Sequence, residues 1–184
     1  MSMSLRLRTV SDIDIRDIEK EPLRLGILHS GEILDPSILD DLEPLEKEQI
    51  INWFPKTKSE IFYIEGMFQS LHYLLTSETE WGTGSFSLNF LTGQRLDIGE
   101  IGWDSATFYN SDEVKEISNA LNVLDYTTIA EKYSAGFFNE KKIHPSGNKW
   151  ADNDTESFLE KLKELSKFIN EANSKNLEIY RVLV

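Results

Sequence analysis

The chain has 184 residues, of which 40% are hydrophobic and 11% aromatic, enough to bury the core of a single domain spanning residues 1–184. It has 19 lysine and arginine residues and 32 aspartate and glutamate residues, so the net charge is 19 − 32 = −13. A field of that sign repels nucleic-acid phosphates and anionic lipids, so we expect neither nucleic acid nor membrane as a partner. The absence of cysteine excludes disulfides, thiolate nucleophiles and cysteine-ligated zinc.

The N-terminus does not resemble a targeting signal. Residues 1–10 contain two arginines without an apolar segment behind them, which does not match a signal peptide. No window approaches the roughly eighteen apolar residues that a membrane-spanning helix needs. We therefore expect a cytoplasmic protein.

The first predicted elements are a strand and a short helix. Residues 5–10 alternate apolar and basic side chains, which predicts a half-buried strand with its leucines inward and its arginines outward. Ser11 then precedes an acidic first turn that contains Asp14, a pattern typical of a helix N-terminus. We expect this helix to end before Pro22.

Glycine and proline divide residues 23–55 into short pieces. Pro36 and Pro44 each suit a first helical turn, so we predict a loop with two short helices. Four apolar residues of the second piece could share one face: Leu45, Ile50, Trp53 and Phe54.

Residues 61–76, IFYIEGMFQSLHYLLT, predict one helix that is apolar on most sides and therefore buried on most sides. Gly66 within it would allow another element to pack closely. His72 lies two turns after Glu65, so both side chains could share one face of such a helix.

Glycines and aromatic residues are concentrated in residues 77–109, which predicts a loop with one short strand or helix at 86–91. Binding residues are often found on loops of this kind. Its candidate binding surface consists of Trp103, Asp104, Phe108 and Tyr109, although these residues could equally anchor the loop on the core.

Helices dominate the C-terminal half. Asn110 and Glu113 form a capping box that predicts one helix, and Asn153 and Glu156 predict another, long and amphipathic. Residues 177–184 read as a final strand, and their apolar end favours a central position in a sheet. The predicted fold is therefore α+β, with a small sheet that includes both terminal strands and is covered by several helices.

Histidine offers the only catalytic candidate. His72 could act as a general base oriented by a carboxylate such as Glu65 or Glu100, or it could be a core histidine bonded to a backbone carbonyl. No nucleophile lies near it in the sequence. Zinc-hydrolase and EF-hand patterns are absent, so we predict no metal. The segment at 82–85, GTGS, lacks the lysine of a phosphate-binding loop, so we predict no cofactor.

Three segments resemble the YfbM-like family of bacterial proteins, domain-of-unknown-function family 1877. They are SLHYLLT at 70–76, the loop and capped helix at 98–121, and IHP at 143–145 followed by Trp150, a long helix and an apolar strand. The resemblance implies a compact α+β domain in a bacterial, cytosolic protein with no established activity. It supplies no catalytic residues.

Three functions remain open at this point. The missing catalytic and metal motifs favour a non-enzymatic binding module for a protein partner, and the net charge favours a basic partner. The alternative is an enzyme or small-ligand binder that uses His72 with a carboxylate. An immunity-type protein that binds a basic toxin is a third reading, which only the acidity supports.

Overall fold

The computed structural model describes residues 4–33, 36–80, 83–92, 100–101, 104–144 and 150–184. Its main sheet is antiparallel and has the strand order β2-β1-β6-β5. The four strands are β1 (Ser4–Val10), β2 (Ile61–Glu65), β5 (Thr107–Tyr109) and β6 (Glu178–Leu183). The strands β3 (Glu100–Ile101) and β4 (Asp104–Ser105) pair with each other. The α+β fold with both terminal strands in one sheet is therefore confirmed.

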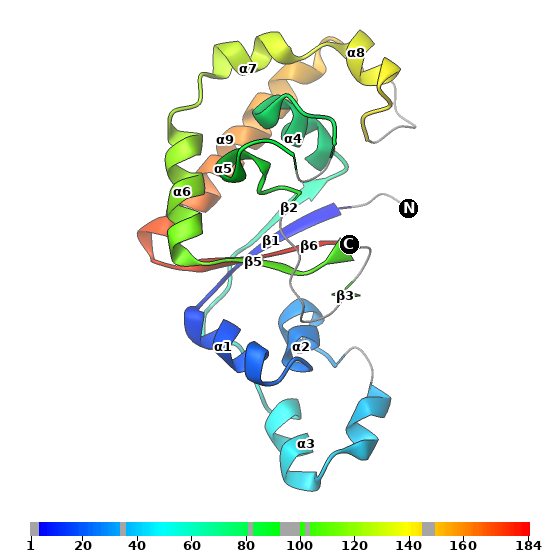
Figure 1. Cartoon of the computed structure of the whole chain (residues 1–184), viewed down its shortest axis with the longest axis vertical. Coiled ribbons are helices and arrows are strands. Elements are labelled where there is room, and N and C mark those ends of the chain that lie inside the picture. The colour runs from blue at the N-terminus through cyan, green and yellow to red at the C-terminus, as the bar shows by residue number, and fades with distance from the viewer. Residues whose placement is uncertain (1–3, 34–35, 81–82, 93–99, 102–103, 145–149) are drawn as a thin grey trace.

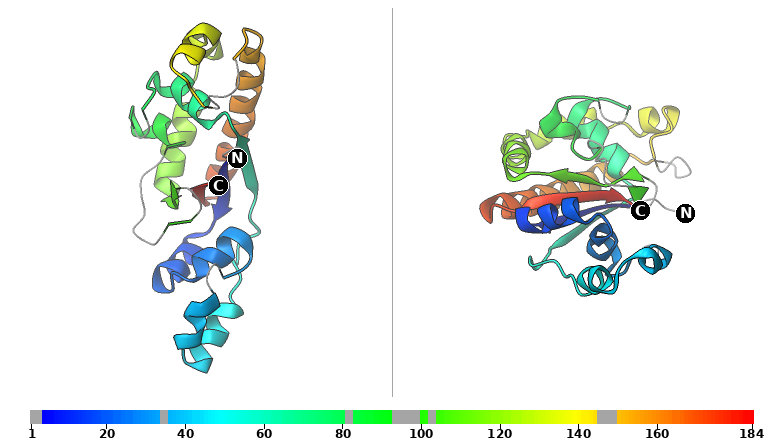
Figure 2. Two further views of the ribbon diagram at one scale, coloured as in Figure 1. Left: turned by 90° about the vertical axis from the view of Figure 1, so that its right-hand side faces the viewer. Right: turned by 60° about the horizontal axis from the view of Figure 1, so that its bottom comes forward.

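Helices cover both faces of this sheet (Figure 1). Six lie on one face: α4 (Phe68–Thr76), α5 (Phe86–Asn89), α6 (Ser111–Asn122), α7 (Tyr126–Lys132), α8 (Ala135–Glu140) and α9 (Asp154–Ser174). The opposite face carries α1 (Asp12–Lys20), α2 (Arg24–Ser30), the 3-10 helix η1 (Pro36–Asp41) and α3 (Pro44–Ile51). Both views of Figure 2 show the sheet between these two layers.

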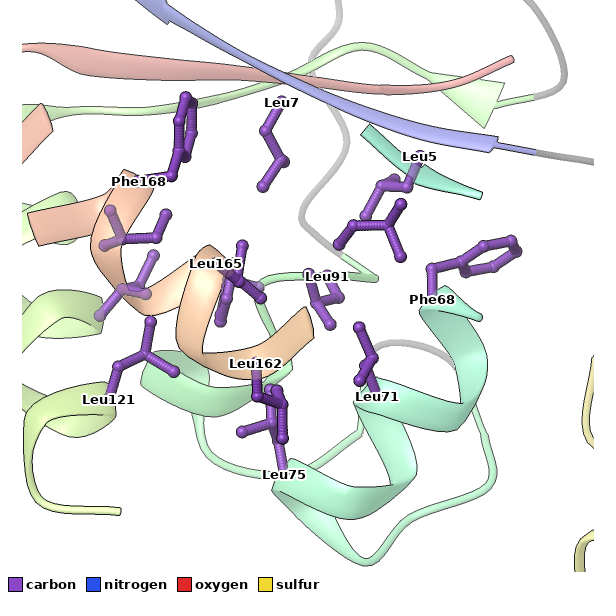
Figure 3. Close-up of a cluster of buried hydrophobic side chains, with 14 of the residues drawn as sticks. Leu5, Leu7, Phe68, Leu71, Leu75, Leu91, Leu121, Leu162, Leu165 and Phe168 are labelled. Carbon is purple, nitrogen blue, oxygen red and sulfur yellow. The ribbon is translucent and has the colours of Figure 1, made fainter. Parts of the chain in front are cut away.

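The alternation predicted for the first strand produces two cores. Leu5 and Leu7 are fully buried on the α4 and α9 side, where Figure 3 shows them pointing toward leucines of those helices. Val10 belongs instead to the smaller core under α1 and α2, together with Tyr180 and Val182 of β6. All residues of β6 are buried and the strand lies between β1 and β5, which confirms the predicted central position of the last strand.

The prediction of one helix over residues 61–76 is wrong. Residues 61–65 form β2, which pairs with β1, and only residues 68–76 are helical. Gly66 between them has φ +66°, a left-handed conformation that glycine adopts at little cost, so the chain turns there. A short apolar run suits either a strand or a helix, and pairing with β1 decided for a strand. Glu65 and His72 therefore share no helix face.

Residues 23–55 contain the two predicted helical pieces, η1 and α3, but the helix α2 was missed. The predicted common face is also only half right. Ile50 and Trp53 are buried, whereas Leu45 and Phe54 are 73% and 69% exposed. Leu45 lies on α3 and Phe54 follows that helix, and neither belongs to the smaller core that Ile50 and Trp53 help to form.

Two further predictions need correction. The long helix α9 is not capped by the side chain of Asn153; the Asp154 carboxylate accepts a hydrogen bond from the Ala151 amide at 2.8 Å. Residues 107–109 are not loop, because they pair with β6 as strand β5. The capping box of Asn110 and Glu113 at the start of α6 is confirmed.

Asp14 ties the first helix to the segment that leads into β2. It completes the capping box with Ser11, and its fully buried carboxylate also accepts hydrogen bonds from the amides of Lys56 (2.7 Å) and Thr57 (3.3 Å). Burial by itself would raise the pKa of Asp14, but the hydrogen bonds from Ser11, Lys56 and Thr57 outweigh it and lower the pKa below its ordinary value.

We expect Asp14→Ala to lower the free energy of unfolding by roughly 2–4 kcal/mol, because it removes the carboxylate half of the capping box and leaves the amides of Ser11, Lys56 and Thr57 without their acceptor. Urea unfolding followed by circular dichroism measures the loss. Since the folded-state pKa is depressed, the stabilisation by Asp14 is present above its ordinary pKa of 3.8 and disappears as the pH falls through the lower folded value. The difference between wild type and variant should therefore narrow in acid.

The matched control is Asp12→Ala, which removes an exposed ion pair to Arg16 in the same helical turn. An exposed pair of this kind contributes about 1 kcal/mol or less. Equal losses in the two variants would contradict the tying role of Asp14.

Candidate functional site

His72 is sealed in the core of the α4 layer. Its side chain is 0% exposed, and its Nε2 lies 3.1 Å from the carbonyl oxygen of Glu80. Burial, first of all, lowers the pKa of His72, against weaker effects of Glu80 and Glu78 that raise it. This is the core histidine that the sequence left open as one alternative. Glu65 lies exposed at the end of β2, and the side chain of Glu100 lies outside the described residues.

The structure describes only part of the predicted binding surface, the side chains of Phe108 and Tyr109. Tyr109 is buried in the core and donates a 2.6 Å hydrogen bond to the Phe90 carbonyl, so it serves as an anchor. Phe108 is half-buried on the other face of the sheet from Tyr109. Its ring centroid lies 5.3 Å from that of Tyr180 on the same face. Trp103 and the side chain of Asp104 lie outside the described residues. β5 therefore sends Phe108 and Tyr109 to different faces.

A different site lies on the α2 face of the sheet. A cavity of about 590 Å³ opens there between strands β1 and β2, the C-terminal end of α2 and the segment after α3. We call it the arginine pocket, and its defining residues are Arg6, Arg8, His29, Phe54, Ile61 and Tyr63. Among the described residues that line it there is no aspartate or glutamate.

The strand register brings these side chains together. Arg6 is opposite Tyr63 and Arg8 is opposite Ile61, and residues directly opposite in a ladder point to the same face. The guanidinium carbon of Arg6 lies 5.2 Å from the centroid of the Tyr63 ring, a cation–π contact. Phe54 forms the exposed outer wall.

Helix α2 holds both guanidinium groups in place. Nη1 of Arg6 donates to the carbonyl of His29 at 2.9 Å, and Nη1 of Arg8 donates to the carbonyl of Leu28. These carbonyls belong to the last turn of α2, where the helix dipole favours positive charge. The Nε atoms of both arginines are buried and have no hydrogen-bond acceptor within the described part of the chain. An arginine carries five N–H donors, so both keep donors in excess.

The pocket is electrostatically positive. Burial and then the charges of Arg6 and Arg8 lower the pKa of His29, and burial followed by the neighbouring Arg6 lowers the pKa of Arg8. The Nδ1 atom of His29 lies 3.1 Å from the hydroxyl of Tyr180, whose pKa burial raises. Two fixed guanidinium groups and a titratable imidazole are the groups that bind carboxylate or phosphate.

Other surfaces offer less. A shallow cavity of about 460 Å³ on α9 is lined by two lysines and by Glu171, and its charges compensate each other in part. Within the described ranges, no cluster of histidine and acidic residues could hold a metal ion. None of the helices there combines the length and apolar character needed to cross a bilayer.

Sequence reasoning placed the two arginines outward and went no further. The available signal was their alternation: positions 6 and 8 of one strand share a face. What it could not supply was the partner on that face, because α2 was not predicted and β2 was assigned to a helix.

The site and the fold define an α+β domain whose antiparallel sheet carries a cationic pocket. The chain belongs to the family described as Domain of unknown function (DUF1877), which matches residues 1–180 and confirms the resemblance noted in the sequence. A similar solved structure is "The Crystal Structure of a Protein of Unknown Function YfbM from Escherichia coli", with a TM-score of 0.66 over 100% of both chains. At 12% identity this likeness shows the fold alone. No curated protein matches the chain.

The sealed position of His72 has a measurable consequence. We expect its imidazole to titrate below the ordinary pKa of 6.5, because burial disfavours the charged form. NMR titration of the ring carbon shift measures this pKa, and the same protein unfolded in urea gives the reference. A pKa at or above the reference would show that His72 meets solvent or a carboxylate.

Proposed function

We propose that this protein is a binding module without catalysis of its own, and that its ligand places a carboxylate or phosphate group in the arginine pocket. The observation that carries the proposal is a pair of half-buried arginines and a histidine around one cavity that no acidic side chain of the described residues lines. Such a cavity attracts a compact anion from outside the chain.

Both arginines hold α2 in place and still have N–H donors that can bind a ligand. Each guanidinium donates one hydrogen bond to α2, and this bond fixes the orientation in which the remaining donors face a ligand. Charge-assisted bonds from a fixed donor cost little ordering entropy, so they favour affinity.

The proposal changes the expected charge of the partner. The net charge of −13 favoured a basic partner, whereas the pocket favours an acidic group on the ligand. Both statements hold at different scales, because salt screens the total charge over about 8–10 Å while the pocket acts at contact distance. The acidic remainder of the surface would then oppose ligands that carry extended negative charge.

Arg8→Gln should weaken the binding of inorganic phosphate by roughly tenfold or more, because a charge-assisted hydrogen bond contributes about 1.5–3 kcal/mol. Isothermal titration calorimetry at low ionic strength measures the affinity. Arg6→Gln should act in the same direction.

Arg24→Gln provides the matched control. Arg24 also donates to a helix carbonyl, that of Asp17 at 3.0 Å, but it does not line the pocket. It should reduce stability without changing phosphate affinity. Phosphate binding that survives in the double variant R6Q/R8Q would overturn the proposed function.

Anion binding should also depend on pH. A bound anion favours the protonated form of His29, whose pKa in the free protein lies below the ordinary 6.5. Affinity should therefore increase as the pH falls through the pKa of His29 in the complex and level off below its pKa in the free protein. Phosphate itself titrates near this range, so sulfate is the suitable probe, with His29→Gln as the control that should abolish the dependence.

A further inference from the structure

The outer edge of β2 borders the arginine pocket and is unpaired within the described part of the chain. The left view of Figure 2 shows β2 at the margin of the sheet, with its neighbour β1 on one side only. An edge strand presents a row of backbone donors and acceptors on which another extended segment can pair.

The register identifies which backbone groups are free. The Thr9 amide donates to the Glu60 carbonyl at 3.0 Å, and bonded pairs alternate along an antiparallel ladder. The backbone groups of Phe62 and Ile64 therefore point toward β1, whereas those of Ile61, Tyr63 and Glu65 point away from it. None of these three residues has a backbone hydrogen bond to another described segment.

The strand lacks the usual protection of an edge. Ile61 and Tyr63 are 43% and 42% exposed, and β2 contains no proline, no lysine and no bulge that would turn a partner away. Ile61 and Tyr63 are also the β2 residues that line the pocket. Free edge groups and pocket-lining side chains thus belong to the same two residues.

We propose that the edge of β2 takes up an extended segment of a partner protein as a fifth strand, and that an acidic side chain of this segment enters the arginine pocket. The inference rests on the proposed function, since the pocket selects the acid. A residue opposite Tyr63 on the added strand would point to the pocket face, beside the guanidinium of Arg6. Main-chain hydrogen bonds would supply affinity, and the pocket would supply specificity.

Charge complementarity argues for an acidic segment rather than a second copy of this chain. The pocket beside the edge carries Arg6, Arg8 and His29, and the strand itself carries one charge, that of Glu65. Two copies joined at β2 would instead bring two chains of net charge −13 together.

The test uses a matched pair of variants, Tyr63→Pro and Tyr63→Ala. Both remove the same side chain, but only proline removes the outward amide, and proline is tolerated on an edge strand whose N–H faces solvent. Peptides are selected against the wild-type chain from a displayed library of random linear sequences. We expect the selected peptides to place an acidic residue among apolar ones, and to bind Tyr63→Pro roughly tenfold or more weakly than Tyr63→Ala.

Two further measurements separate the outcomes. Replacing the acid of a selected peptide by glutamine should weaken binding roughly tenfold, and amide hydrogen exchange of Ile61, Tyr63 and Glu65 should slow when the peptide binds wild type. The exchange measurement decides the question even if Tyr63→Pro fails to fold. No enriched peptide, equal binding to both variants, or unchanged exchange would overturn the inference.

Inorganic phosphate distinguishes this inference from the function on which it rests. If phosphate binding requires the arginines but peptides bind Tyr63→Pro and Tyr63→Ala equally, the edge inference fails and the proposed function stands. If phosphate binding is insensitive to R6Q/R8Q, the proposed function itself fails. A wild-type dimer in sedimentation velocity that Tyr63→Pro abolishes and Tyr63→Ala retains would assign the edge to a second copy and overturn the acidic partner.

Discussion

The antiparallel pairing of β1 with β6 constrains the rest of this structure. It joins the two ends of the chain at the centre of the sheet, with Leu7 opposite Arg181 and Arg8 opposite Tyr180. Because side chains alternate along a strand, this register sends the leucines of β1 into the larger core and its arginines to the α2 face. A slip by one residue would turn Arg6 and Arg8 toward the larger core and Leu5 and Leu7 away from it, so the pattern of β1 favours the observed register.

Helix α2 explains how two guanidinium groups can stay half-buried beside each other. Like charges repel, and desolvation opposes both, as the lowered pKa of Arg8 shows. The negative end of the helix dipole and the carbonyls of Leu28 and His29 offset this cost. The same contacts dock α2 on the sheet, so docking the helix and forming a positive pocket are one event.

Strand β2, which ends at the turn of Gly66, forms the second wall of the pocket. A left-handed glycine lets the chain leave β2 and enter α4 within two residues, so β2 ends there, and the strand order places it at the sheet edge. Ile61 and Tyr63 then stand beside the arginines, while Phe62 stacks on Phe168 of α9 on the other face. One strand thus contributes to the larger core, the pocket and the free edge.

The sequence by itself determined the class of fold, the family, the alternating first strand, the central last strand and the caps of α1 and α6. These features depend on contacts a few residues apart or on a regular apolar period, and both can be read locally. The sequence also led to His72 as a catalytic candidate, because a histidine in an apolar segment is easily recognised. The sequence does not show that this side chain is buried.

Only the tertiary structure decided the identity of β2, the existence of α2 in the fold and the arginine pocket. Residues 61–65 have an apolar pattern that fits either element, and the ladder with β1, more than fifty residues away, selected the strand. The pocket requires that ladder together with the docking of α2 through Arg6 and Arg8. A site formed by long-range register leaves no local pattern in the sequence, because its residues become neighbours only when the strands pair.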